Sequence, residues 1–135
     1  MKVSECMSRN VRLCSPDDSL REAARKMKEC DAGAMPVGER NRLIGMITDR
    51  DIVVRALAEG KGPDTRVREA MSPHVYYAFD DEDLDAAAAT MNQLKIRRLP
   101  ILNRQRQVVG ILSRADVWHS RKEDPGAAAA LHDVA

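Results

Sequence analysis

The sequence predicts a mixed α/β (α+β) fold of two pseudo-symmetric β-α-β-β-α repeats, packed sheet to sheet with their helices outside. Two observations support this prediction. The chain of 135 residues aligns with itself, one half against the other, and each half shows strand and helix patterns in the same order. A chain of this length suits one compact domain, or two small halves that share a core.

The internal repeat is visible in four segments, which pair as 3–11 with 67–75, 19–27 with 83–91, 34–37 with 98–101 and 43–53 with 108–118. Identical residues within these pairs include a methionine, a proline, a glycine and an aspartate. We therefore assign residues 1–62 to a first repeat, 63–122 to a second repeat and 123–135 to a flexible C-terminal tail.

The first three elements of each repeat follow from local pattern. Short strands are predicted at VRLCSP and VYYAFD, and apolar residues at helical spacing then predict helices from Leu20 to Cys30 and from Leu84 to Leu94. Asp18 or Ser19 can cap the first of these helices, and Asp83 can cap the second. A proline in AMPV and in RLPIL marks the start or edge of the next strand.

The last two elements are a strand and a helix. LIGMIT and VVGILS are nearly continuous apolar runs, which are typical of a strand buried on both faces. The helix DRDIVVRALAEG should stop at Gly60 and Gly62, and RADVWHSRKED should stop before Pro125. The segment 59–66 then connects the two repeats.

Composition excludes several classes of protein. The 22 basic residues nearly balance the 21 acidic ones, so the net charge of +1 gives no bulk attraction to nucleic acid or to a membrane. Aromatic residues make up 3% of the chain, too few for a base-stacking platform. No apolar run approaches the roughly 20 residues of a membrane span, and no secretory signal is apparent, so we predict a cytoplasmic protein. Cys6, Cys14 and Cys30 lack the spacing of a disulfide framework or a zinc site, and we expect reduced, partly buried thiols.

One motif occurs at the same place in both repeats, where the apolar strand turns into the following helix. Thr48 and Asp51 stand in GMITDRD, and Ser113 and Asp116 stand in GILSRAD. A hydroxyl followed three residues later by an acid can be a capping box. The same geometry also suits a nucleotide, because a helix start attracts phosphate and a carboxylate can accept both hydroxyls of a ribose. The glycine of each motif either lets a ligand approach or reflects a bulge or tight packing.

A basic pair adds to the nucleotide interpretation. Arg97 and Arg98 precede Pro100, and arginine donates two parallel hydrogen bonds to phosphate. The alternative interpretation is a solvated basic edge. The first repeat has Gly33 and Ala34 at the equivalent places, so the two halves are chemically unequal.

On these residues the chain resembles a tandem pair from the CBS domain family, over about residues 3–120. The resemblance implies two clefts between the repeats that take adenosine nucleotides, including AMP, ADP, ATP, NAD or S-adenosylmethionine. In the family the acid holds the ribose and the hydroxyl lies near ribose or phosphate. The basic pair before the proline often comes from the opposite repeat.

Carried over to this chain, the resemblance implies one cleft formed by Met46, Thr48, Arg50, Asp51, Arg97, Arg98 and Pro100. Met46 and Pro100 would flank the adenine. It implies a second cleft formed by Ile111, Ser113, Asp116, Ala34 and Pro36. The second cleft lacks the basic pair, so we expect the first cleft to hold phosphorylated ligands more tightly.

The sequence gives little support to an enzyme. It has no evident Ser–His–acid arrangement, metal-ligand spacing or GxxxxGK loop, and nothing places Cys14 and His74 together as a reactive pair. We predict a non-catalytic regulatory module with no obligatory cofactor and no bound metal, which binds adenine nucleotides and signals to an unidentified protein in trans. The alternatives are a stress-response or interaction scaffold with little ligand binding and, more remotely, a nucleic-acid binder through KIRR.

We also predict a homodimer. The helix 49–59 carries Ile52, Val53, Ala56 and Leu57, and the second repeat offers Val117 and Trp118 at matching places. Trp118 is either an interface anchor or simple packing over the core. The family resemblance implies the same state, since tandem CBS modules commonly pair into a flat disc through these helices.

Overall fold

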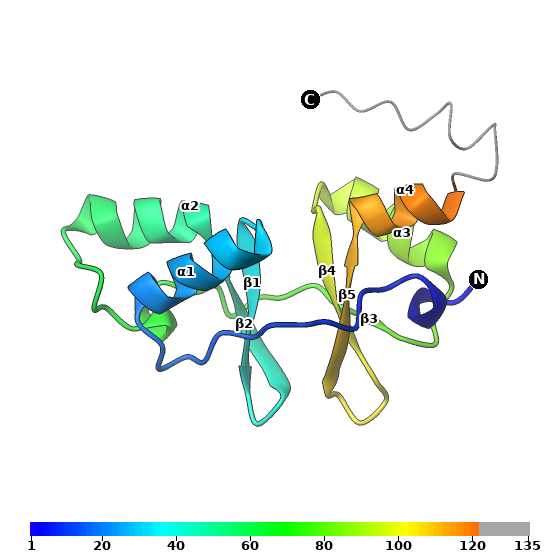
Figure 1. Ribbon diagram of the computed structural model, residues 1–135, viewed down its shortest axis with the longest axis horizontal. Helices are drawn as coiled ribbons and strands as arrows, with labels where there is room; N and C mark the ends of the chain where they lie inside the picture. The colour runs from blue at the N-terminus through cyan, green and yellow to red at the C-terminus, as the bar shows by residue number, and fades with distance from the viewer. Residues whose placement is uncertain (122–135) are drawn as a thin grey trace. The chain divides into compact units, whose positions relative to one another are not determined.

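The computed structural model describes residues 1–121, so the predicted tail at 123–135 lies outside the described residues. The described chain forms two compact units, each with a small sheet and helices (Figure 1). Unit 1 contains residues 1–11, 77–105 and the described residues from 109 onward, and unit 2 contains 12–76 and 106–108. The predicted mixed α+β class is confirmed.

Unit 2 is built on an antiparallel hairpin of β1 (Ala34–Glu39) and β2 (Arg42–Thr48). Helix α1 (Leu20–Cys30) precedes the hairpin. A helical segment follows it, passing from α2 (Asp49–Asp51) through a π turn at Ile52–Ala56 to a 3-10 turn at Leu57–Glu59. The segment ends at Gly60, whose φ of 78° is the left-handed conformation that favours glycine, so the predicted stop is confirmed.

Helix α1 shows why these residues form a helix. The Ser19 hydroxyl accepts a hydrogen bond from the Glu22 N–H at 3.1 Å, which caps the first turn. Leu20, Ala23 and Met27 fall on one face and are buried in the core of unit 2. The chain leaves the helix through a left-handed residue, Asp31.

Unit 1 repeats this plan with a three-stranded sheet in the order β3-β4-β5. Its elements in chain order are β3 (Ala78–Phe79), α3 (Leu84–Leu94), β4 (Arg98–Leu102), β5 (Val108–Ser113) and α4 (Arg114–Arg121). Strand β3 runs parallel to β4, with Ala78 opposite Ile101. The Asp83 carboxylate accepts a hydrogen bond from the Ala86 N–H at 3.3 Å, so the predicted cap of α3 is confirmed.

Two predictions about strands were wrong. VRLCSP forms one bridging pair, Cys14 with Val37, because Pro16 has no N–H with which to extend the pairing. The short strand predicted in VYYAFD, by contrast, is present as β3 at Ala78–Phe79. The strands predicted to be buried on both faces are not: buried and half-buried residues alternate along β5 and in the second half of β2, because alternate side chains of a strand point to opposite faces and only one face meets the core.

An exchange of segments between the repeats was not foreseen. In unit 1, Ser8 and Ile111 exchange two backbone hydrogen bonds of 2.9 Å. In unit 2, Met46 and Ser72 do the same at 2.9 and 2.8 Å. Residues 1–11 therefore pack with the second repeat, and the matching segment 67–75 packs with the first. The repeat boundaries at residues 62 and 63 stay a sequence prediction.

The glycines of the repeated motif have a packing role. A Cβ atom at Gly45 would lie 2.7 Å from the Ser72 carbonyl oxygen and 3.0 Å from Met71 Sδ. A Cβ at Gly110 would collide with Met7 Sδ and lie 3.0 Å from the Ser8 carbonyl oxygen. Of the two interpretations of these glycines, the structure supports close packing of backbone.

We predict that Gly45→Ala destabilises the protein by about 1–3 kcal/mol, because the Ser72 backbone cannot yield as a flexible side chain would. Chemical denaturation measures the change. Gly62→Ala is the matched control, since a Cβ there meets nothing within 4 Å, and it should be neutral or slightly stabilising. Equal stability of the Gly45→Ala variant and the native protein would contradict the packing role.

Candidate functional site

The turn after β2 holds Thr48 and Asp51 in a closed pair of hydrogen bonds. The Asp51 N–H donates to Thr48 Oγ1 at 3.0 Å, and the Thr48 N–H donates to Asp51 Oδ2 at 3.0 Å. Thr48 is thus the N-cap of α2, and the two residues form a capping box. The capping interpretation of the motif is confirmed for this copy, and it fixes the orientation of both side chains.

The turn after β5 has the same geometry. The Asp116 N–H donates to Ser113 Oγ at 3.0 Å, and the Ser113 N–H donates to Asp116 Oδ2 at 2.9 Å. Repetition of the whole arrangement in two separate units shows that the motif determines the turn locally. The hydrogen bonds of the turn therefore hold the hydroxyl and the carboxylate in the same orientation in both copies.

Capping uses one oxygen of each carboxylate. The second oxygen of Asp51, Oδ1, faces only the Arg55 Nε at 3.7 Å among the described residues, and the Asp51 side chain is 16% exposed. Within residues 1–121, Asp116 makes no ion pair. Each turn can therefore offer a partly sheltered carboxylate oxygen to a hydroxyl group while the cap stays formed.

The structure also shows how the predicted site residues are shared between the units. In unit 2, Ala34 lies opposite Thr48, and Pro36 lies opposite Met46, across the β1–β2 pair. Arg50 follows on α2 with an exposed side chain. Each of these pairs joins one residue predicted for the first cleft to one predicted for the second.

Unit 1 holds the remaining predicted residues. Arg97 is exposed just before β4, Arg98 is half-buried at its start, and Pro100 is fully buried within it. Ile111 and Ser113 are half-buried on β5, and Asp116 follows on α4. Each unit therefore carries part of the residues of each predicted cleft, and the combination of residues across the two units stays a prediction.

Arg114 and Asp49 also lie beside these turns, although neither was among the site residues predicted from the sequence. The Arg114 N–H donates to the Arg97 carbonyl oxygen at 3.0 Å, which places three arginine positions at one end of β4 and β5. In unit 2 the matching bond runs from the Asp49 N–H to the Gly33 carbonyl oxygen at 2.9 Å. The signal was available in the aligned motifs, where Asp49 matches Arg114. The Ser113 turn thus has a cation of its own, and the Thr48 turn has an extra carboxylate.

Within residues 1–121 the cysteines belong to no cluster of possible metal ligands. All three thiols are free, and burial raises the pKa of the Cys14 thiol to about 11. Burial also raises the pKa of the Cys6 thiol. The hydrogen bond with Ser120 lowers this pKa by less, and the negative charge of Asp116 raises it further. No group of three or more possible metal ligands occurs within residues 1–121. No helix in that range is long and apolar enough to cross a membrane.

Comparison with known proteins identifies the family. The model of the CBS domain matches residues 3–57 and 67–117, so the chain belongs to the CBS domain family and contains two copies of the domain. The chain is 37% identical over 132 residues to the CBS domain-containing protein YhcV of Bacillus subtilis, across 98% of this chain and 94% of that protein. The resemblance predicted from the repeated motifs is confirmed.

Solved structures of CBS domain pairs share the fold. The CBS domain pair of protein MJ0100, in complex with 5-methylthioadenosine and S-adenosyl-L-methionine, is similar with a TM-score of 0.78 and 27% identity, across 91% of this chain and 97% of that one. CBSX2 in complex with AMP gives a TM-score of 0.79 and 25% identity, across 90% of this chain and 96% of that one. The ligands of both relatives contain adenosine.

We predict that Thr48→Ala lowers the free energy of unfolding by about 1 kcal/mol, because the Asp51 N–H loses its cap. Thr48→Ser should retain most of the stability. Thr90→Ala is a matched control: Thr90 is exposed in the middle of α3, where alanine is the better helix former. Denaturation curves in which Thr48→Ala and Thr90→Ala behave alike would contradict the capping role.

Proposed function

We propose that this protein is a non-catalytic regulatory module that binds an adenine nucleotide between its two CBS repeats and signals to another protein in trans. The observation that carries the proposal is the doubled capped turn. Each copy holds a hydroxyl and a carboxylate rigidly and leaves one carboxylate oxygen for a ligand hydroxyl. The adenosine ligands of two related CBS pairs support the choice of ligand class.

In the first proposed cleft, Asp51 accepts hydrogen bonds from the ribose hydroxyls through Oδ1. Thr48 and Arg50 lie at the same turn, towards ribose and phosphate. Met46 and Pro100 flank the adenine, and Arg97 and Arg98 neutralise the phosphate. The ribose must displace the Arg55 guanidinium from Asp51, which is a small cost because the contact is long, at 3.7 Å, and the Arg55 side chain is 54% exposed.

In the second proposed cleft, Ser113, Asp116 and Ile111 act with Ala34 and Pro36. This cleft has no basic pair, and Arg114 is the cation nearest to its turn in sequence. We therefore propose that the first cleft holds phosphorylated ligands more tightly than the second. A crystal structure with nucleotide in the second cleft alone would refute this order.

The key test of the site is Asp51→Ala. We expect it to weaken AMP binding by about 1.5–3 kcal/mol, the range for a hydrogen bond to a charged group, as measured by calorimetry. Asp83→Ala is the matched control, because Asp83 also caps a helix through its carboxylate but is not one of the proposed ligand residues. Equal AMP affinity in the Asp51→Ala and Asp83→Ala proteins would remove Asp51 from the site.

A homodimer belongs to the same proposal. Val53 and Val54 on the segment after α2 are 53% and 45% exposed, which leaves apolar surface uncovered. Ala56 and Val117, which the sequence had suggested for the contact, lie in the cores of their units instead. Trp118 is half-buried, which fits both an interface anchor and packing over the core.

Light scattering at micromolar concentration tests the dimer. We expect the mass of two chains, near twice 15.0 kDa, and the mass of one chain for Val53→Glu/Val54→Glu, in which charge replaces the exposed apolar surface. A native protein that scatters as one chain, with and without AMP, would refute both the dimer and signalling through it.

The free thiols also favour our proposal of a reducing, cytoplasmic setting.

A further inference from the structure

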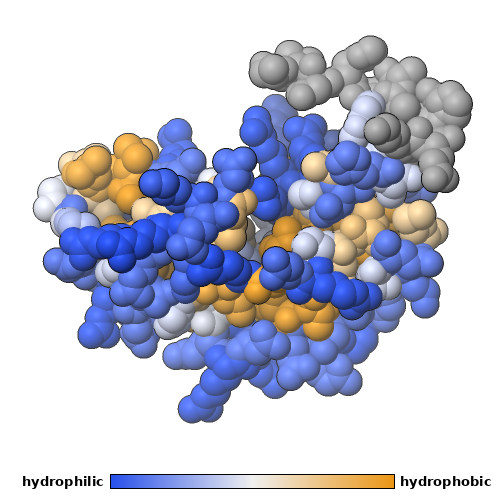
Figure 2. All heavy atoms as spheres, in the orientation of Figure 1, coloured by the Kyte–Doolittle hydropathy of each residue, from blue (hydrophilic) through white to orange (hydrophobic). Residues whose placement is uncertain are grey.

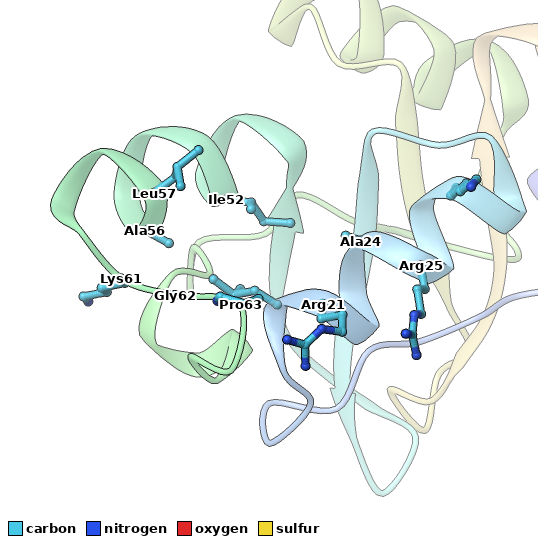
Figure 3. Close-up of a pocket in the computed structure, with 11 residues that line it drawn as sticks. Arg21, Ala24, Arg25, Ile52, Ala56, Leu57, Lys61, Gly62 and Pro63 are labelled. Carbon is cyan, nitrogen blue, oxygen red and sulfur yellow. The ribbon is translucent and has the colours of Figure 1, made fainter.

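Helix α1 has two sides with different surroundings. One side lines a groove that it shares with the helical segment after α2, and Figure 3 shows Arg21 and Arg25 on this side. Ile52 and Leu57 line the same groove, which continues the surface that we assign to the homodimer. The other side of α1 lies along the chain that precedes the helix, and two of the three cysteines are found there.

Two side-chain contacts hold the preceding chain against this second side of α1. The Lys26 ammonium donates a hydrogen bond to the Leu13 carbonyl oxygen at 3.0 Å. The Arg12 guanidinium pairs with the Glu29 carboxylate. Cys14 follows directly after these two anchored residues, so its backbone runs beside the helix.

Cys14 and Cys30 reach the same core from these two elements. Cys14 is fully buried in the core of unit 2, and Cys30, the last residue of α1, is half-buried and packs against that core. Lys26 and Cys30 are one helical turn apart, so Cys30 lies on the side of α1 that meets the chain carrying Cys14. One buried thiol and one accessible thiol therefore share the same region of unit 2.

The Arg12 guanidinium interacts with both thiols. Its hydrogen bond with Glu29 and a weaker one with Cys30 raise the pKa of Arg12. Burial raises the pKa of the Cys14 thiol to about 11; the positive charges of Lys26 and Arg12 oppose this rise, and Cys30 adds to it. Cys14 is therefore protonated at neutral pH. A guanidinium beside Cys30 stabilises the negative charge that a sulfur carries during thiol–disulfide exchange.

We propose that Cys30 and Cys14 form a redox site that undergoes thiol–disulfide exchange with a small disulfide of the glutathione class. The Cys30 thiolate attacks one sulfur of that disulfide, forms a mixed disulfide and releases one glutathione thiolate. The Cys14 thiol then attacks the Cys30 sulfur, its proton passes to the second leaving thiolate, and a disulfide between Cys14 and Cys30 forms. In total the two cysteines lose two electrons and two protons, and the small disulfide takes them up to become two thiols.

The surroundings assign the order of the two steps. Cys30 is the thiol that a reagent in solution can reach, and the surface around α1 is mainly hydrophilic (Figure 2), which suits a polar, charged disulfide. Cys14 is fully buried and can react only with the neighbouring Cys30. Cys6 belongs to unit 1, where its thiol donates to the Asp116 carbonyl oxygen at 3.1 Å. The redox site lies within unit 2 and does not depend on nucleotide binding.

The test uses the full chain, incubated with oxidised glutathione, quenched with acid and analysed by intact mass and peptide mapping. The native chain should lose two hydrogen atoms in mass and give one peptide pair joined through Cys14 and Cys30. Cys14→Ala should stop at one glutathione on Cys30, and Cys30→Ala should leave Cys14 unmodified. Cys6→Ala is the matched control and should form the disulfide at the native rate.

A second set of variants tests the role of Arg12. Arg12→Gln should slow the addition of glutathione to Cys30 by about fivefold or more, because the developing negative charge loses its guanidinium. Arg42→Gln is the matched control: it removes an exposed guanidinium from β2 of the same unit, and the rate should stay within about twofold of the native rate. Thermal melts establish that each variant is folded.

Several results would overturn the proposal. It fails if the native chain does not react, or if glutathione accumulates on Cys30 without a disulfide to Cys14. It also fails if Cys6 is modified as fast as Cys30, or if the disulfide joins two chains, which a denaturing gel without reductant would show. The peptide map of the native chain needs no substitution, so it decides the outcome even where Cys14→Ala does not fold.

Discussion

The fold within each unit depends on one close contact between a strand and a segment that matches part of the other repeat. Gly45 of β2 lies against Met71 and Ser72, and Gly110 of β5 lies against Met7 and Ser8. Gly45 and Gly110 leave no room for a side chain, and the backbone of Ser72 or Ser8 lies against them. Residues 1–11 complete unit 1 and the segment around Ser72 completes unit 2. Each unit therefore contains a segment that matches part of the other repeat, and unit 1 is assembled from pieces that are far apart in the chain.

The same strands position the candidate site. Each strand ends at a hydroxyl residue that caps the following helix, and the acid three residues later returns a hydrogen bond to the strand end. Capping is therefore compatible with the ligand binding that we propose, because the cap uses one carboxylate oxygen and leaves the other for a ligand hydroxyl. The helical segment from Asp49 to Glu59 extends from that turn, with Asp51 near its start and the exposed Leu57 near its end.

Much of this could be predicted from local patterns. The repeat, the caps at Ser19 and Asp83, the stop at Gly60 and the hydroxyl–acid turns depend on residues close in sequence, and the structure confirms them. The exchange of segments could not be predicted, because the matched copies 3–11 and 67–75 fit either unit by pattern alone. The position of Arg114 in the site was missed for a similar reason: Arg97 and Arg114 become neighbours only when β4 pairs with β5.

Ligand binding by the intact chain is the most direct test of the central claim that this module senses adenine nucleotides. Thermal unfolding should be followed with AMP, ADP, ATP, NAD and S-adenosylmethionine, each at increasing concentration. At least one ligand should stabilise the native protein, by about 2.7 kcal/mol when its concentration reaches 100 times Kd, and the stabilisation should be lost when Asp51 and Asp116 are both replaced by alanine. Unfolding that is unchanged by all five ligands at millimolar concentration would contradict the account.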